Sequence, residues 1–401
     1  EGYLAARERS GFYVQEYLAL PTRPEEVPPP VSAAPPEAAE PPVRFDLSTR
    51  GVDPGLFPFR TWARLQKELL YSSPQLLTHG DAQGDVELRQ ALADYLEEYR
   101  GVRCTAEQVV VGAGMEYLLS LLAPLLPGKT AVENPGYQRA KQVLENNGVA
   151  CCCLPVDADG LSVEALSGSG AAVCYVTPSH QFPTGATMPI ARRTELLRWA
   201  GAAPGRYVVE DDYDSEFRYD TRPIPSLQGL DQAGRVIYVS TFSKSMAPSM
   251  RIGYMVLPEK LMERYISTMN FYSCTVSNFE QYTLAAFINK GHFEKHINRL
   301  RIHYHDKRDM LLQCIKSSPL SNHVTIKGED AGLHFLMKID TELTDEIICQ
   351  RAAAKGIRIM PLSKYYYHPE KAMQHILVVN YSSLTQEQMT EATQAFNEIL
   401  G

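Results

Sequence analysis

The sequence predicts an α/β protein built on a mainly parallel sheet of seven strands, with helices covering both faces. From residue 84 to residue 260, short apolar runs alternate with helix-length segments, which is the order typical of parallel sheets. The runs are rich in valine, alanine, tyrosine and cysteine, as expected for strands buried on both faces. After residue 258 the pattern changes, which indicates a second, smaller domain.

The elements of the large domain follow one another along the chain. Gly84 to Arg100 is amphipathic, with Leu88, Leu92 and Leu96 at helical spacing. A further helix is expected from Glu116 to Leu126. The predicted strands are residues 108–111, 129–133, 149–154, 171–177, 206–211, 235–240 and 252–257.

The smaller domain is expected to be α+β. A long helical region, about 276 to 316, precedes four strand candidates: Thr325–Ile326, Gly332–Ile339, Ile357–Met360 and Ile376–Val379. Residues before 70 are assigned to the same domain. The predicted boundaries are therefore 43–70 for its N-terminal part, 71–270 for the large domain and 271–401 for its C-terminal part.

Composition narrows the class of protein. With 401 residues, 44% hydrophobic and 21% charged, two domains of a soluble globular protein are expected. A net charge of −8 argues against nucleic-acid binding by this chain itself, although an additional basic domain is compatible with it. Without an apolar run of about 18 residues or a signal peptide, we expect a cytoplasmic protein with no membrane partner.

The eight cysteines predict neither a metal site nor disulfides. Cys151, Cys152 and Cys153 are consecutive within an apolar run, and neighbours on a strand point to opposite faces. They therefore cannot form a compact chelating site. Buried, reduced thiols are expected instead.

Residues 23–42 contain eight prolines and predict a stiff, partly extended linker. The preceding residues, 1–22, are too short to fold alone. Arg9-Ser10-Gly11-Phe12 is a turn-rich segment expected to close a hairpin, either as the last wing of a winged helix or as an ordinary N-terminal arm. In the first case the chain is expected to be a fragment of a longer protein.

Lys244 is the strongest candidate for chemistry. It follows the apolar run Arg235–Val239 within Ser-Thr-Phe-Ser-Lys, and Arg251 comes seven residues later. A lysine at the mouth of a sheet forms a Schiff base with an aldehyde cofactor, while Thr241, Ser243 and Arg251 hold a phosphate dianion. This pattern predicts pyridoxal 5′-phosphate.

Two other segments fit the same cofactor. The strand Arg206–Glu210 ends in Asp211, Asp212 and Tyr213. A carboxylate there pairs with a protonated pyridine nitrogen, and either Asp211 or Asp212 can take this role. Gly112-Ala-Gly114-Met115 opens a helix, where backbone amides approach a phosphate, although such a motif alone is more often a plain tight turn.

These residues carry a family resemblance over roughly residues 45 to 400. The chain resembles fold-type I pyridoxal-phosphate enzymes of aminotransferase class I/II, and most of all the aminotransferase-like domain of MocR-type regulators of the GntR family. The matching phrases are Glu210–Tyr219, Val176–Gly185 and Thr241–Lys244. The resemblance implies a seven-stranded large domain and a homodimer whose sites are completed by both subunits, with His79 as the candidate crossing residue.

The resemblance also implies roles for single residues. Tyr137 corresponds to the aromatic residue that stacks on the cofactor, and Phe182 occupies the cofactor-binding place where the family carries asparagine. Arg139 is the candidate for binding a ligand carboxylate, with a solvated helix arginine as the alternative. The usual carboxylate-binding arginine of the C-terminal strand is replaced by Val378 or Val379, for which Arg139 or Arg358 can substitute.

Two functions are compatible with these residues. The first is a sensing domain of a transcription regulator, which binds pyridoxal phosphate, forms an aldimine with a small amine or amino acid, and contacts DNA only through an absent winged-helix domain. The alternative is a competent aminotransferase. The missing arginine removes a pair worth about 1.5–3 kcal/mol, which favours the sensor.

Overall fold

The computed structural model describes residues 3–15, 43–48, 51–219 and 224–400. It comprises two compact units, residues 1–42 and 43–401. In the first, β1 (Leu4–Arg7) and β2 (Gly11–Val14) pair antiparallel, with Leu4 opposite Val14. The expected hairpin is therefore present. The Pro-rich linker predicted at residues 23–42 lies outside the described residues.

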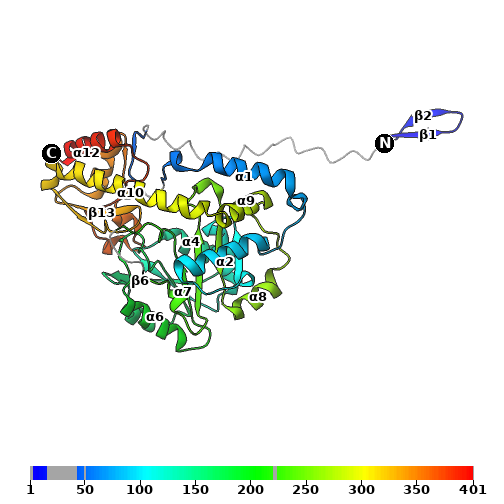
Figure 1. Cartoon of the computed structure of the whole chain (residues 1–401), viewed down its shortest axis with the longest axis horizontal. Coiled ribbons are helices and arrows are strands. Elements are labelled where there is room, and N and C mark those ends of the chain that lie inside the picture. The colour runs from blue at the N-terminus through cyan, green and yellow to red at the C-terminus, as the bar shows by residue number, and fades with distance from the viewer. Residues whose placement is uncertain (1–2, 16–42, 49–50, 220–223, 401) are drawn as a thin grey trace. The chain divides into compact units, whose positions relative to one another are not determined.

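The second unit is centred on a mixed sheet in the order β4-β11-β10-β9-β8-β5-β6-β7 (Figure 1). Its strands are β4 (Val109–Gly112), β5 (Thr130–Asn134), β6 (Cys151–Asp157), β7 (Gly160–Leu161), β8 (Val173–Val176), β9 (Tyr207–Asp211), β10 (Val236–Thr241) and β11 (Gly253–Val256). All seven predicted strands are present. The prediction missed β7, which pairs antiparallel with β6 at the edge of the sheet.

Most of the sheet is parallel. β6, β5, β8, β9 and β10 run in one direction, whereas β11 is antiparallel to both of its neighbours. Because side chains alternate between the faces, neighbouring residues of one strand enter different clusters. Val208 packs in one buried cluster, and Tyr207 and Val209 pack in another.

Helices cover both faces of this sheet. One face packs against α3 (Met115–Leu122), α4 (Gln138–Asn146) and α8 (Glu259–Met269). The opposite face packs against α5 (Val163–Gly168), α6 (Ile190–Gly201) and α7 (Leu227–Leu230), and against α2 (Val86–Arg100) and α9 (Asn278–Asn289). The α/β fold class predicted from the sequence is confirmed.

A second, smaller sheet lies in the C-terminal part. β12 (Val324–Lys327), β13 (His334–Ile339) and β15 (Ile376–Asn380) pair antiparallel. β14 (Ile357–Arg358) pairs instead with β3 (Phe45–Asp46), near the start of this unit. The N-terminal residues therefore contribute a strand to the C-terminal part.

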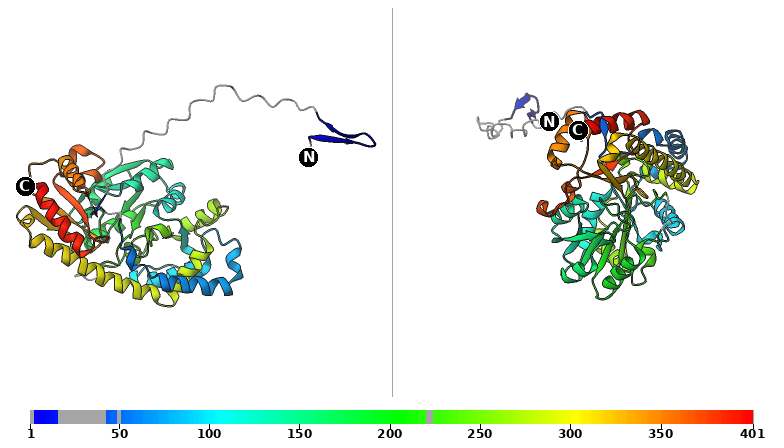
Figure 2. Two further views of the ribbon diagram at one scale, coloured as in Figure 1. Left: turned by 90° about the horizontal axis from the view of Figure 1, so that it is seen from above. Right: turned by 90° about the vertical axis from the view of Figure 1, so that its left-hand side faces the viewer.

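The predicted helical region 276–316 is not one helix. It divides into α9 and α10 (His292–Lys316) at Gly291, whose positive φ of 69° is a left-handed conformation that ends α9. The long α10 contacts α9 at one end and α12 (Gln386–Leu400) further along, as Figure 2 shows for α10 in yellow and α12 in red.

The remaining helices are short or peripheral. α1 (Phe59–Ser72) packs on α9, and α11 (Asp345–Ala354) packs on α12. The 3-10 helices are Pro54–Leu56, Pro74–Leu77, Ala106–Gln108, Ala123–Leu125, Pro248–Met250, Pro319–Asn322, Leu362–Tyr365 and Pro369–Lys371. Among the described helices, none combines the length and apolar character that a membrane span requires. All eight cysteines lie in the described part of the chain, and all are free thiols.

Candidate functional site

The predicted site residues converge on the carboxyl edge of the large sheet. Gly114 follows β4, Tyr137 follows β5, Asp211 ends β9 and Lys244 follows β10. Ligands of such sheets bind outside the carboxyl ends of the strands. Each of these residues lies at or just after the end of a buried strand, which explains how positions far apart in sequence reach one place.

Lys244 lies within this edge. Burial lowers the pKa of its amine to about 8, with the charge of Asp214 opposing that shift. The amine is therefore partly neutral near physiological pH. Only the neutral form attacks an aldehyde, so this environment suits Schiff-base chemistry.

Asp211 and Asp212 have different surroundings. The hydroxyl of Tyr175 donates to Asp211 Oδ2, whereas Asp211 Oδ1 accepts no hydrogen bond from the described residues although it is buried. Burial raises the pKa of Asp211 to about 8, against the lowering effect of the Tyr175 hydrogen bond. Asp211 thus retains a buried acceptor atom that the described side chains leave available.

Asp212 is engaged in a buried ion pair. Its Oδ2 lies 2.8 Å from Arg100 Nε and accepts hydrogen bonds from Ser215 and Tyr238. Burial opposes ionisation, but Arg100 and the hydroxyl donors outweigh it and hold the pKa of Asp212 below its ordinary value. The geometry favours Asp211 over Asp212 as the partner of a pyridine nitrogen.

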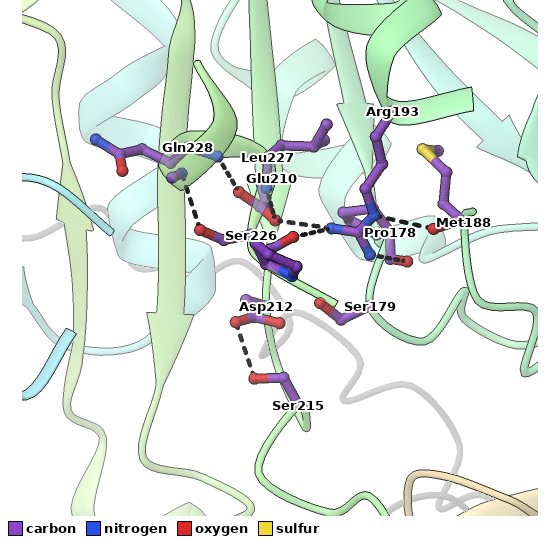
Figure 3. Close-up of polar contacts among 12 residues, drawn as sticks. Pro178, Ser179, Met188, Arg193, Glu210, Asp212, Ser215, Ser226, Leu227 and Gln228 are labelled. Atoms are coloured by element: carbon purple, nitrogen blue, oxygen red, sulfur yellow. Dashed lines mark hydrogen bonds and ion pairs between the residues drawn. The ribbon is translucent and has the colours of Figure 1, made fainter. Parts of the chain in front are cut away.

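A second buried network surrounds Glu210, two residues before Asp212 (Figure 3). Arg193 is fully buried, and its guanidinium donates to the carbonyl oxygens of Pro178, Met188 and Pro225 at 2.8–2.9 Å. Its Nη1 lies 3.9 Å from Glu210. The network ties the loop after β8 to β9, and so fixes the position of the strand end that carries Asp211.

Glu210 completes the network from β9. Its two oxygens accept the backbone N–H groups of Leu227 and Gln228 at 2.8 and 2.9 Å, as drawn in Figure 3. Burial raises the pKa of Glu210 to about 7, and the neighbouring Asp212 charge adds to the shift. Glu210 therefore supports α7 and takes no direct place at the sheet edge.

Tyr213 contacts a histidine that has partners of its own. The Tyr213 hydroxyl lies 3.0 Å from His180 Nδ1, which also lies 2.8 Å from Asp214 Oδ2. The His180 and His334 rings are 4.7 Å apart. Possible metal-ligating atoms of His180, Asp214 and His334 lie within 4.8 Å of one another, but His334 Nε2 is already bonded to the Pro183 carbonyl at 3.1 Å.

Phe182 stands among aromatic rings. Its centroid lies 6.2 Å from that of Tyr137, 6.0 Å from Tyr213 and 5.1 Å from Tyr365, all edge to face. A hydrocarbon ring supplies no donor at this place, so any hydrogen bond to a ligand must come from neighbours such as Tyr213. The tyrosine predicted to stack and the phenylalanine that replaces asparagine are thus brought together.

A C-terminal segment is hydrogen-bonded to the loop that carries Tyr137. Gly136 N donates to Tyr365 O at 3.3 Å, Gln138 Nε2 donates to Lys364 O at 2.6 Å, and Tyr367 N donates to Asn134 Oδ1 at 3.0 Å. Residues 364–367 therefore form one wall beside the loop after β5.

Gly114 and Met115 begin α3 at the predicted phosphate position. Gly114 has a positive φ of 88° and no side chain, and a Cβ there would lie 2.8 Å from Arg251 Nη2. Only glycine permits this approach. Met115 is buried against the core of α3, Thr241 ends β10 and Ser243 follows it. Thr241 pairs with Gly253 of β11, which pairs with Gly112 of β4, so the end of β10 lies in register with the turn that carries Gly114.

Arg139 and Arg251 both contact Glu116. Arg251 Nη2 lies 2.8 Å from Glu116 Oε2, and Arg139 Nη1 lies 3.2 Å from Glu116 Oε1. The Tyr137 hydroxyl donates to the same Oε1 at 3.5 Å. Arg139 is thus oriented toward the phosphate-side residues, as a residue of the site would be, although 62% of its side chain remains exposed.

Arg358 lies on β14. Its Nη1 pairs with Asp46 Oδ2 of β3 at 3.1 Å, so this guanidinium stabilises the pairing between those strands. Val378 and Val379 are buried in β15 and pair with β13. Of the two arginines predicted to bind a ligand carboxylate, Arg139 is the one that Glu116 connects to another predicted site residue, Arg251.

Sequence reasoning missed several neighbours of the site. Glu116 and Asp214 lie within or beside the predicted motifs, so their charge could have identified them as neighbours of the site. Tyr175 and His334 had no signal, because their roles depend on strands that pair only in three dimensions. Glu133 is a further case, since its Oε2 accepts from Thr177 and Gln181, and burial raises its pKa to about 7.

Replacing Asp211 tests its burial. The folded protein holds the proton of Asp211 up to about pH 8, whereas the unfolded chain loses it at about pH 4, so stability from this group falls as pH rises between those values. Asp211→Asn should therefore raise the Tm of the cofactor-free protein by roughly 2–5 °C at about pH 8.5 and by much less at about pH 5. The exposed Asp94→Asn is the control, and thermal denaturation that gives equal shifts at both pH values would contradict the assignment.

Comparisons with known proteins agree with the fold. The model of the family "Aminotransferase class I and II" matches residues 52–396. The chain is 39% identical to the uncharacterized HTH-type transcriptional regulator YdeL of Bacillus subtilis, over 92% of this chain and 80% of that one. It is 36% identical to the probable rhizopine catabolism regulatory protein MocR of Rhizobium meliloti, over 84% of this chain and 68% of that one. The crystal structure of a multiple substrate aminotransferase from Thermococcus profundus superposes with a TM-score of 0.79 and 25% identity, covering 91% of this chain and 92% of that one. The chain therefore belongs to the aminotransferase class I and II family, among relatives that include HTH-type transcriptional regulators of the MocR type.

Proposed function

We propose that this chain is the pyridoxal-phosphate-binding, effector-sensing part of a transcription regulator. The observation that carries the proposal is an intact cofactor edge next to a C-terminal strand with no carboxylate-binding arginine. Lys244 has a buried amine of lowered pKa, and Asp211 leaves its buried Oδ1 without a described donor, whereas the place of the arginine is taken by the buried Val378 or Val379. The site thus keeps the means to capture an amine and lacks the usual means to orient an α-amino acid.

The residues present fit pyridoxal 5′-phosphate. Lys244 would hold the aldehyde carbon, and the buried Oδ1 of Asp211, which no described donor occupies, would accept the pyridinium N–H. Arg251, Thr241, Ser243 and the amides after Gly114 would hold the phosphate. When bound, the cofactor supplies an electrophilic carbon and an electron sink for primary amines.

The surrounding side chains determine how firmly and how precisely a ligand is held. Tyr213, with His180 and Asp214 behind it, supplies the hydroxyl that Phe182 cannot. Tyr137 and Phe182 exclude water from one side. Lys244 and Arg139 together would bind a ligand firmly. An α-carboxylate, however, has no second group that fixes its orientation. Precise orientation is what fast turnover needs.

The assignment as a regulator also draws on the relatives and the N-terminal hairpin. YdeL and MocR are named as regulatory proteins, and the β1–β2 hairpin has the form of the wing in a winged helix. With a net charge of −8, this chain is expected to bind DNA poorly by itself. We propose that DNA is contacted through a separate winged-helix domain. Ligand binding to the described unit would change the conformation or position of that domain.

A homodimer accords with exposed apolar residues near the phosphate side. Leu70, Tyr71 and Leu77 are exposed, as are Phe271 and Tyr272, and Asn278 Nδ2 joins the two segments through Thr78 O at 2.8 Å. His79 follows directly and is also exposed. Exposed apolar side chains on two joined segments are typical of protein interfaces.

Purified protein should be yellow, and Lys244→Ala should abolish its visible absorbance because the amine that condenses with the aldehyde is gone. Lys260→Ala, an exposed lysine of α8, should leave the absorbance unchanged. Spectrophotometry before and after adding pyridoxal phosphate measures both. A wild-type protein that stays colourless with excess cofactor would overturn the central assignment.

Turnover separates the sensor from the enzyme. With common α-amino acids and 2-oxoglutarate, steady-state assays should give slow or undetectable turnover, while some primary amine shifts the visible spectrum. The reason is the absence of a guanidinium on the described strand β15. A kcat near the enzyme median of about 10 per second with any amino acid would favour the aminotransferase.

Sedimentation should give a dimer at micromolar concentration. Tyr71→Glu, which adds charge to a side chain 85% exposed, should shift the protein toward monomer because a buried unpaired carboxylate is costly. Ile302→Glu, on the exposed face of α10, should not. A cofactor-loaded monomer in the wild type would count against the proposal.

A further inference from the structure

Glu116 joins two arginines that belong to different parts of the site. Its Oε2 lies 2.8 Å from Arg251 Nη2, and its Oε1 lies 3.2 Å from Arg139 Nη1. These arginines come from separate elements, α4 for Arg139 and the turn before β11 for Arg251. A third donor, the Tyr137 hydroxyl, lies 3.5 Å from Oε1. One carboxylate thus connects the phosphate side of the site with the ligand side.

The position of Arg251 makes this contact significant. Arg251 Nη2 also donates to the Ala113 carbonyl at 3.3 Å, and the guanidinium is packed so closely on Gly114 that a Cβ would lie 2.8 Å away. It is therefore held beside the turn that opens α3. The Glu116 carboxylate therefore pairs with one nitrogen of the guanidinium that would bind an incoming phosphate.

The contact is open to exchange. The Glu116 side chain is 31% exposed and that of Arg251 is 50% exposed, so water and ions reach both. Burial disfavours the charged carboxylate, but the hydrogen bond and charge of Arg251 outweigh it, with help from Arg139, and hold the pKa of Glu116 below its ordinary value. Glu116 is therefore an anion at neutral pH, and a phosphate dianion placed nearby is repelled by it.

We propose that Glu116 is an internal competitor for the phosphate of the cofactor at Arg251, and that its second oxygen couples this competition to Arg139. The inference rests on the proposed function for the identity of the phosphate ligand. Release of Glu116 from Arg251 leaves Arg139 as its counter-charge. By pairing with the released Glu116, Arg139 thus lowers the free-energy cost of binding the phosphate at Arg251.

The decisive experiment compares two forms of one vitamer on Glu116→Gln. Glutamine keeps an oxygen acceptor and removes only the charge. Pyridoxal 5′-phosphate should bind about three- to tenfold more tightly to Glu116→Gln than to wild type, as expected for one partly screened like-charge contact. Pyridoxal, which has no phosphate, should bind both within about twofold. Glu145→Gln, which loses an exposed pair with Lys141 on α4, should change neither.

A double-mutant cycle tests the coupling. Arg139→Ala should weaken pyridoxal 5′-phosphate binding about two- to threefold when Glu116 is present, and should have less effect in the Glu116→Gln background. Raising the salt concentration should shrink the difference between wild type and Glu116→Gln. Unchanged or weaker phosphate-vitamer binding by Glu116→Gln, or an equal gain for pyridoxal, would overturn the proposal.

A measurement without cofactor separates this inference from the proposed function. Inorganic phosphate should raise the Tm of cofactor-free Glu116→Gln more than that of cofactor-free wild type, because the competitor is gone. If the wild type fails to form a coloured complex, the proposed function fails, yet the phosphate-induced shift still decides the role of Glu116. Equal shifts in both proteins would contradict that role even in a protein that turns yellow.

Discussion

The buried ion pair between Arg100 and Asp212 is the interaction on which the site depends. Arg100 ends α2 and Asp212 follows β9, so the pair fastens a covering helix to the centre of the sheet at its carboxyl edge. Because Asp212 is held by Arg100, Ser215 and Tyr238, its neighbour Asp211 is the carboxylate left for other work. Removing one partner of such a pair leaves an uncompensated buried charge and costs about 3–5 kcal/mol. Asp212 thus has a structural role, and Asp211 is available for a chemical one.

The charge of this edge has a common cause. Burial raises the pKa of Glu133 to about 7 and that of Asp211 to about 8, so both carboxyl groups exchange protons near neutral pH. The same burial lowers the pKa of Lys244 to about 8. Such a region tolerates a cationic ring nitrogen better than a further anion. The negative end of the cofactor would instead meet α3 and Arg251, away from these carboxyl groups.

The fold and the central residues were accessible from sequence because they are local. A strand of five or six residues with an apolar run of three or four, ending in Asp211 or leading to Lys244, places its functional residue by itself. The choice between Asp211 and Asp212 was not local, since it depends on Arg100, 112 residues away. The break at Gly291 was hidden by helical periodicity on both sides, and β7 is too short to carry a pattern. Arg358 was a reasonable substitute by charge, but only the pairing of β14 with β3 reveals its partner, Asp46.

The hydrogen bonds between residues 364–367 and the loop after β5 make these two segments move together. Two of them join residues 226 and 233 positions apart in sequence through the side chains of Gln138 and Asn134. The third, from Gly136 N to Tyr365 O, is main-chain on both sides, so side-chain changes do not remove it. The rings of Tyr365 and Tyr137 both pack edge to face against Phe182, so a ligand that pushes on this aromatic group pushes on both segments at once. The smaller sheet is attached to residues 364–367 through the bridge from Pro361, just before them, to Leu377 of β15. A molecule bound at the carboxyl edge of the large sheet would therefore act on segments that are connected directly to the smaller sheet.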